Sequence, residues 1–231
     1  MQNNLNIVFK YILYNGGTTM SLFLGKIHYW LFNKILWFEK LEQEIIKLAE
    51  TEGLNVEELR KEINGKYGDP TPNLPLEEMI DTSNIHGWLQ GKIHSAEGRM
   101  AAWTTKVLNN NKEASAKFED IYLKQGIKAA QEVKEKGMEL VSAPEIFNSI
   151  NDYILDGMPC DRVNEVIRSE EDIVEWKRML CVHSDIWNEE EGDVNYFYKL
   201  RSIWIKAFVK EVNSNFEYIE EADDIKIIKR K

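Results

Sequence analysis

Apolar residues recur at helical spacing along most of the chain, and polar turns separate these stretches. Between residues 21 and 50 they follow one another every three or four positions, as on one face of a helix. Asn55 with Glu58, and Ser142 with Glu145, have the spacing of helix N-terminal caps. The helices expected on this basis cover residues 21–50, 55–63, 84–108, 112–136, 142–155, 169–187 and 194–216.

No segment shows a convincing alternation of apolar and polar residues of the kind that is typical of a strand. Its basic end, from Lys226 to Lys231, is interpreted as a solvated tail. We therefore predict an all-α fold, a multi-helix bundle that forms one domain over residues 20–231.

Two segments of the chain resemble each other in sequence, and this similarity is here called the echo. Residues 27–39 and 85–97 agree at seven of thirteen positions. The matched pairs are Ile27/Ile85, His28/His86, Trp30/Trp88, Leu31/Leu89, Lys34/Lys92, Ile35/Ile93 and Glu39/Glu97. If the echo is a repeat, the bundle contains two related helical hairpins, with further helices at its C-terminal end.

The echo leaves two packing directions open. On one helix His28 and Glu39 stand about 16 Å apart, so they cannot bind the same metal ion there. Antiparallel neighbours would bring His28 to Glu97 and His86 to Glu39. Parallel neighbours would bring His28 beside His86 and Glu39 beside Glu97. The long connection between the two segments permits either arrangement.

Composition and charge exclude some kinds of binding partner and some cellular locations. The net charge of -10 disfavours nucleic acid, because phosphate binding needs a basic surface. Only two cysteines occur, Cys160 and Cys181, which fits a reducing compartment and predicts a cytoplasmic protein. No membrane span is expected, because Lys26 and Lys34 interrupt the apolar segment of residues 21–38.

The first nineteen residues have two interpretations. Met20 follows Gly-Gly-Thr-Thr, which a purine-rich ribosome-binding stretch before a start codon would encode. In that case residues 1–19 are a doubtful extension from a mis-called start and do not belong to the fold. The alternative is an apolar N-terminal strand or helix packed on the bundle.

The histidines are the first candidates for chemistry. His28, His86, His94 and His183 are the only four in the chain, and all fall on predicted helices. Imidazole is a common ligand of zinc and iron, and three of these rings could converge in the bundle centre. Glu39 or Glu97 would then bind the metal, or would orient the imidazoles. The alternative is a set of core histidines hydrogen-bonded to nearby carboxylates.

Seven tryptophans provide a second kind of candidate. Trp30, Trp88 and Trp187 could form the wall of a flat cofactor pocket. Haem held by one helical histidine would suit such a wall. The alternative is an aromatic-rich helical core.

Three functional hypotheses follow. The first is a bundle with a zinc, non-haem iron or haem site that senses or processes a small molecule. The second is a non-enzymatic interaction or scaffold protein that uses aromatic helical faces for a partner or for homo-oligomerisation. The third is a metal-independent enzyme with a His–Glu pair as general base. Phosphate-binding loops and zinc-protease motifs are absent from the sequence, which disfavours the common nucleotide enzymes and zinc proteases.

Overall fold

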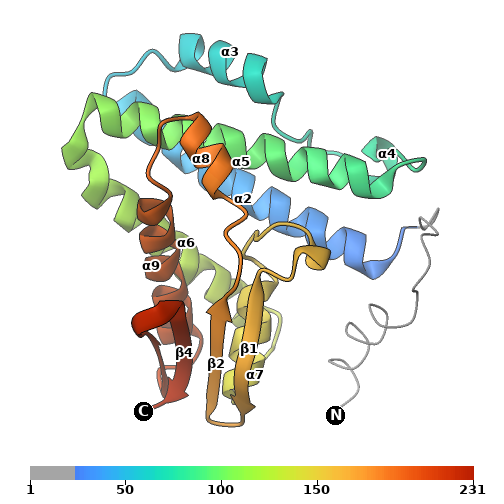
Figure 1. Ribbon diagram of the computed structural model, residues 1–231, viewed down its shortest axis with the longest axis vertical. Coiled ribbons are helices and arrows are strands. Elements are labelled where there is room, and N and C mark those ends of the chain that lie inside the picture. The colour runs from blue at the N-terminus through green and yellow to red at the C-terminus, as the bar shows by residue number, and fades with distance from the viewer. Residues whose placement is uncertain (1–23) are drawn as a thin grey trace.

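A computed structural model describes residues 24–231 of the chain, so both interpretations of residues 1–19 concern a segment outside this range. Long helices occupy one end of the molecule and a four-stranded antiparallel sheet occupies the other (Figure 1). The α-helices are Lys26–Thr51 (α2), Val56–Tyr67 (α3), Leu76–Met79 (α4), Ile85–Asn110 (α5), Ser115–Glu135 (α6), Ala143–Asn151 (α7), Ser184–Glu189 (α8) and Val194–Val212 (α9). The strands are Asn164–Glu170 (β1), Ile173–Arg178 (β2), Phe216–Glu220 (β3) and Ile225–Arg230 (β4).

Helices α2 and α5, which carry the echoed segments, lie side by side and run in the same direction (Figure 1). Near their N-terminal ends, the ring centroids of His28 and His86 are 5.8 Å apart. Near their C-terminal ends, the Asn110 side chain donates a hydrogen bond to the backbone oxygen of Glu52 at 3.0 Å. Of the two directions that the echo left open, the chain therefore adopts the parallel one.

Side-chain caps mark where several helices begin. The Asn55 side chain accepts a hydrogen bond from the backbone N–H of Glu58, and Ser142 with Glu145 forms a reciprocal capping box, so both predicted caps are confirmed. Asn84 caps α5 in the same way as Asn55 caps α3. A cap of this kind satisfies an N–H group that has no partner inside the helix, and it stabilises the helix by about 1 kcal/mol.

Two glycines allow helices to approach each other closely. Gly126 of α6 faces α9, where an added Cβ would lie 2.4 Å from the carbonyl oxygen of Trp204. Gly98 of α5 faces α3, where an added Cβ would lie 2.2 Å from the ring of Tyr67. Neither contact leaves room for a methyl group, so these positions set how α6 meets α9 and how α5 meets α3.

The antiparallel sheet shows that the all-α prediction is wrong. Its strand order is β1-β2-β4-β3. The helix predicted over residues 169–187 is in fact the end of β1, all of β2 and the short helix α8. The spacing of Ile173, Trp176 and Leu180 fits a helix, but Val174 and Trp176 also alternate with polar residues. Burial in β2 follows that alternation, because a helix face covers one side of the strand.

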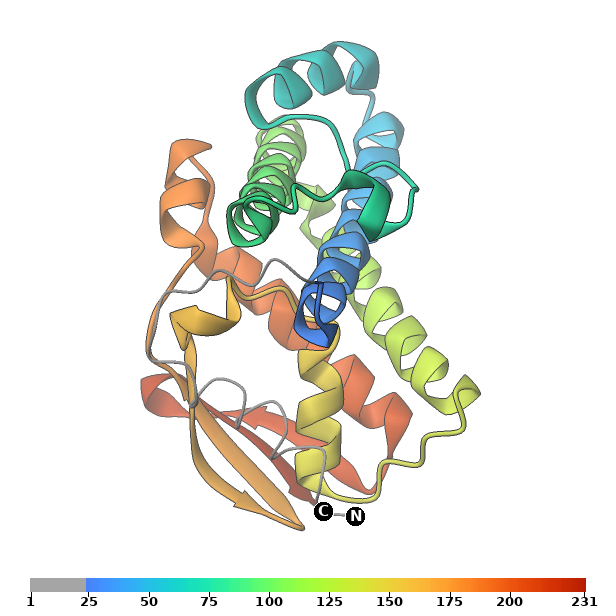
Figure 2. The same ribbon diagram turned by 90° about the vertical axis from the view of Figure 1, so that its right-hand side faces the viewer.

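One face of the sheet is buried beneath α7 and α9 (Figure 2). Val174, Ile228 and Tyr218 lie opposite one another across β2, β4 and β3, and all three are buried. Trp176 follows on the same face, with its ring centroid 4.9 Å from that of Phe147 in α7. Removing these large side chains from water stabilises the packing of helices on strands.

The basic end of the chain is not the solvated tail that we predicted. It forms β4, an inner strand between β2 and β3, in which Ile227 and Ile228 are 5% and 0% exposed. The turn before this strand uses Asp223 and Asp224 in the left-handed region, with φ values of 59° and 62°. It contains no glycine, so the usual sequence signal of a hairpin is missing.

Candidate functional site

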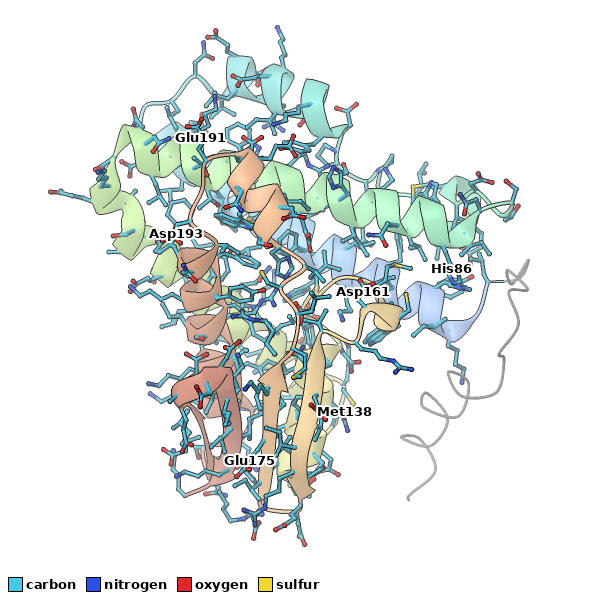
Figure 3. The ribbon with its side chains drawn as sticks, viewed as in Figure 1. His86, Met138, Asp161, Glu175, Glu191 and Asp193 are labelled. Atoms are coloured by element: carbon cyan, nitrogen blue, oxygen red, sulfur yellow. The ribbon has the colours of Figure 1, made fainter. Side chains whose placement is uncertain are left out.

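The four predicted histidines lie in three separate places. His86 lies at the N-terminal end of α5, far from the strands (Figure 3). Its neighbour is His28, at the N-terminal end of α2. His94 is exposed on α5, with its ring centroid 6.1 Å from that of Tyr67. His183 is buried just before α8, where its Nδ1 lies 3.1 Å from Oε1 of Glu97.

The prediction of a metal-binding protein is therefore wrong for the part of the chain that the structure describes. Residues 24–231 contain no group of three or more His, Cys, Asp or Glu side chains that could hold a metal ion. The physical reason is the parallel packing of α2 and α5. His86 and Glu97 stand about 16 Å apart along α5, which separates the His28–His86 pair from His183.

Glu39 is also engaged elsewhere. Its Oε1 lies 2.6 Å from Nη2 of Arg99, and it accepts hydrogen bonds from the backbone and hydroxyl of Thr71. Glu42 binds Nε of the same guanidinium at 2.9 Å. Arg99 is 0% exposed, so this buried triad joins α2 to α5 and is structural. Burial raises the pKa of Glu42, although the charge of Arg99 opposes the change.

The three predicted cofactor tryptophans have three different settings. Trp30 donates a hydrogen bond to Asp152 at 2.7 Å. Trp88 packs near Phe32 with a centroid separation of 6.2 Å. Trp187 stacks on Phe197 at 5.1 Å. The structure does not bring Trp30, Trp88 and Trp187 together around one cavity.

A buried ionic cluster forms where α5, α9 and the segment after α7 meet. Nε2 of His183 lies 3.0 Å from Oδ1 of Asp156, and Nη1 of Arg201 lies 2.7 Å from the same oxygen. A second guanidinium nitrogen of Arg201 donates to the carbonyl oxygen of Leu155 at 2.8 Å. His183 thus lies between two carboxylates, those of Glu97 and Asp156, and is 1% exposed.

The two carboxylates favour the charged form of this imidazole. Burial alone would lower the pKa of His183, but the charge of Glu97 and the hydrogen bond to Asp156 raise it above its ordinary value. Burial would likewise raise the pKa of Asp156, but Arg201 and His183 hold it well below its usual range. An imidazolium held between two carboxylates is poorly suited to accept a proton. The geometry therefore weakens the hypothesis of a His–Glu general base.

Lys34 of α2 lies near this cluster and was not among the predicted site residues. Its side chain is buried, at 5% exposure, with Nζ 4.0 Å from the centroid of the Trp30 ring. Among residues 24–231, no carboxylate oxygen lies within 4.0 Å of that nitrogen. Burial lowers the pKa of Lys34 to about 8, and the charge of Arg201 acts in the same direction, against Asp156 and Asp152.

One turn further along α2 from Lys34 a cleft with aromatic walls begins, here called the aromatic cleft, and Lys34 is not among the residues that line it. It is lined by Trp37, Phe38 and Leu41 of α2, Tyr122 and Gln125 of α6, Tyr153, Ile154 and Leu155 after α7, and Phe197, Arg201 and Trp204 of α9. Its volume of about 30 Å³ leaves room for one or two water molecules, and a haem pocket is far larger. Lys34 is on the helix face that carries Trp37 and Leu41, one turn before the wall begins.

The wall of the aromatic cleft contains two polar groups. Arg201 lines the cleft while two of its nitrogens bind Asp156 and Leu155. The indole N–H of Trp37 is buried and has no hydrogen-bond partner within the described residues. An orphan donor in an aromatic wall is costly for folding, and a ligand or a water molecule would satisfy it.

The sequence contains signals for Lys34 and Arg201 that did not lead to a prediction of a site. Lys34 interrupts an apolar run, which argues against a membrane span, and it is one of the matched positions of the echo. Arg201 lies between Phe197 and Trp204 on the apolar stripe of α9. Lys34 and Arg201 share one signal, a charged residue on the apolar face of a helix. This signal is a better indicator of a functional residue than the rarity of a residue type.

Comparison with known proteins adds no further assignment. No family model, curated protein or solved structure matches this chain. Within residues 24–231, no helix is long and apolar enough to cross a membrane.

Proposed function

We propose that this protein binds a small organic acid in the aromatic cleft, in order to sense or process it. The carboxylate of the ligand lies between Lys34 and Arg201, and its short apolar part lies against the aromatic walls. This keeps the small-molecule part of the hypothesis drawn from the sequence and omits the metal and haem.

The observation that carries the proposal is the largely buried side chain of Lys34, whose ammonium lies over the Trp30 ring and has no carboxylate oxygen within 4.0 Å among residues 24–231. A buried charge without a partner is unfavourable, and it is rarely retained without a role. Lys34 lacks a carboxylate within 4.0 Å among the described residues, although Asp152 and Asp156 lie near enough to influence its pKa. The carboxylate of a ligand would provide the missing partner.

The size of the cleft limits the ligand. A volume of about 30 Å³ is far below the several hundred Å³ of typical drug-sized sites. A short acid is larger than the one or two water molecules that fit, so Tyr153 or Trp204 must move to admit it, and an aromatic acid requires a larger movement. We expect propionate to bind more tightly than phenylacetate.

The test is a titration followed by the indole ¹H–¹⁵N signals of Trp37 and Trp204. We expect propionate to shift both signals saturably and neutral propionamide to shift neither. Lys34→Met should weaken propionate binding about tenfold or more, because it removes a charge-assisted contact. The matched control is Lys92→Met, at the echoed position on α5. Equal shifts with the amide, or equal affinity in the Lys34 variant, would contradict the proposal.

Two free cysteines bear on the location of the protein. Cys160 is exposed, Cys181 is partly buried, and neither forms a disulfide with a described residue. Free thiols suit the reducing cytoplasm, which we retain as the proposed location.

We propose self-association as a second candidate function, because β1 is an open strand edge. All seven of its residues are exposed, and Val166 and Ile167 at its centre are 45% and 53% exposed. Such an edge is a template for pairing with another strand. Antiparallel pairing of two copies, centred between Val166 and Ile167, would place Val166 opposite Ile167 and Glu165 opposite Arg168.

Charge reversal tests this second candidate. Arg168→Glu would place like charges across the pair and should yield a monomer in light scattering. The double variant Glu165→Arg with Arg168→Glu restores opposite charges and should restore the dimer. A wild-type chain that stays monomeric at high concentration would exclude this function.

A further inference from the structure

A groove lies between α2 and α3, at the helical end of the molecule. The loop of residues 52–55 joins these two helices, and α3 runs back antiparallel to α2 (Figure 1). The groove has a volume of about 370 Å³, which is within the usual range of small-molecule sites. It shares no residue with the much smaller aromatic cleft. The groove is therefore a separate place for a ligand.

An arginine without a partner lines this groove. Among residues 24–231, no carboxylate oxygen lies within 4.0 Å of the guanidinium nitrogens of Arg60, and the guanidinium donates no hydrogen bond. The side chain of Arg60 is half-buried. The other basic side chain of the groove, Lys47, binds Glu44 at 2.7 Å. Arg60 is thus the cation that remains for a negatively charged ligand.

Two carboxylates of the groove lie nearer to the loop. Glu50 of α2 and Glu57 of α3 line the groove, and neither has a Lys or Arg nitrogen within 4.0 Å among the described residues. Arg60 is three residues further from the loop than Glu57, about 5 Å along α3. Burial raises the pKa of Glu42, about 12 Å along α2 from Glu50, and the charges of Arg99 and Arg60 oppose that change. Positive and negative charges of the groove are therefore roughly 5–12 Å apart.

Apolar side chains separate these charges. Ile46 of α2 is 6% exposed, and Leu54 and Val56 at the start of α3 are half-buried. An apolar side chain of a ligand would leave water by packing against these three residues, which favours binding.

We propose that the groove binds a short peptide of two or three residues, with free termini and an apolar side chain. The C-terminal carboxylate pairs with Arg60, and the N-terminal ammonium lies beside Glu50 and Glu57. An extended chain spans about 3.3–3.6 Å per residue, so the termini of such a peptide are roughly 6–10 Å apart, as the charges of the groove are. A guanidinium binds a carboxylate through two parallel hydrogen bonds, which favours a carboxylate over other polar groups at Arg60. This inference does not depend on the acid proposed for the aromatic cleft.

A titration of the full chain with the dipeptide alanyl-leucine tests the proposal. We expect saturable shifts of the backbone ¹H–¹⁵N signals of residues 54–60. N-acetyl-alanyl-leucine lacks the ammonium and alanyl-leucine amide lacks the carboxylate, so each should bind about fivefold more weakly. Equal affinity for the three peptides, or no saturable shift at millimolar concentrations, would overturn the inference.

Two variants locate the carboxylate. Arg60→Met should weaken the binding of alanyl-leucine about fivefold and leave the binding of its amide unchanged. Since Arg60 has no ion pair or hydrogen bond among the described residues, its replacement should change Tm little. The matched control is Lys61→Met, which removes the same charge from an exposed position of α3 outside the groove and should leave the affinity unchanged. Equal weakening in both variants would mean that net charge attracts the peptide, and it would overturn the inference. Propionate should not displace the peptide, so failure of the groove and failure of the aromatic cleft are distinguishable.

Discussion

Replacing Lys34 with methionine should make the protein more stable at neutral pH. The ordinary pKa of this group is 10.5 and burial lowers it to about 8. Since a tenfold change in an ionisation constant is about 1.4 kcal/mol, keeping Lys34 charged costs the folded state about 3 kcal/mol. Methionine fills a similar volume without charge but loses the cation–π contact with Trp30, which is worth about 1 kcal/mol.

The net gain is therefore about 1–2 kcal/mol at neutral pH, or roughly 2–8 °C in Tm for a chain of this length. The sign follows from linkage. Below pH 8 the lysine is charged in both folded and unfolded states, and the wild type bears the whole cost. As the pH rises from about 8 to 10.5, folding favours the neutral amine increasingly and the cost disappears. Over that range the wild type should gain about 3 kcal/mol relative to the variant, so the difference of about 1–2 kcal/mol should reverse its sign.

Urea unfolding of the wild type and Lys34→Met at several pH values measures this gap. Other titrating groups occur in both proteins and cancel in the difference. Lys92→Met is the control, and because that side chain is half-exposed we expect a change within about 0.5 kcal/mol. A variant that is less stable than wild type at neutral pH would refute the reasoning, as would a gap that stays constant up to pH 10.5.

Three further predictions concern the interior. His183→Gln should destabilise the protein by about 3 kcal/mol at acidic pH, because it removes the cation between the buried carboxylates of Glu97 and Asp156 and leaves only Arg201 beside Asp156. Since the pKa of His183 is raised, its contribution is complete below 6.5 and is lost as the pH rises through the folded value, so urea unfolding should show the deficit shrinking with pH. Arg99→Met should lower the free energy of unfolding by about 3–5 kcal/mol, and a loss below 1 kcal/mol would show that the triad is dispensable. Gly126→Ala should lower it by about 2–3 kcal/mol because of the 2.4 Å contact, whereas Gly91→Ala, with nothing within 4 Å, should raise it by up to about 1 kcal/mol.

The helices could be predicted from the sequence because their signals are local. Caps such as Ser142 with Glu145, and long apolar stripes, specify where a helix begins and which face it buries. The strands could not be predicted in this way. β2 spans six residues, and its apolar positions fit helical and strand spacing equally well. The sequence of β4 resembles a charged tail, because Lys226 and Lys229 stand among its isoleucines. Ile225 and Ile227 do alternate, but this segment becomes a strand only through its pairing with β2 and β3.

The candidate site, like the sheet, depends on contacts between segments that are distant in the sequence. The sequence drew attention to residues that the two echoed helices share, such as His28 with His86, and those two rings do meet. The site proposed here depends instead on where the two copies differ. Lys34 and Lys92 have equivalent neighbours along their own helices, but only α2 is covered by the segment around Asp152 and by Arg201 of α9.

That asymmetry has a functional consequence. The two echoed segments each carry a lysine over a tryptophan, and the copy that stays half-exposed retains an ordinary surface environment. The covered copy gains a desolvated amine, a neighbouring guanidinium and an aromatic cleft, none of which its local sequence encodes. Burying the charge of Lys34 lowers the stability of the free protein. Binding of an acid beside Lys34 should recover that loss. A saturating acid should therefore stabilise the wild type by RT ln(1 + [L]/Kd) and leave Lys34→Met almost unchanged. An equal rise in Tm for both proteins would mean that the acid binds somewhere other than at this lysine.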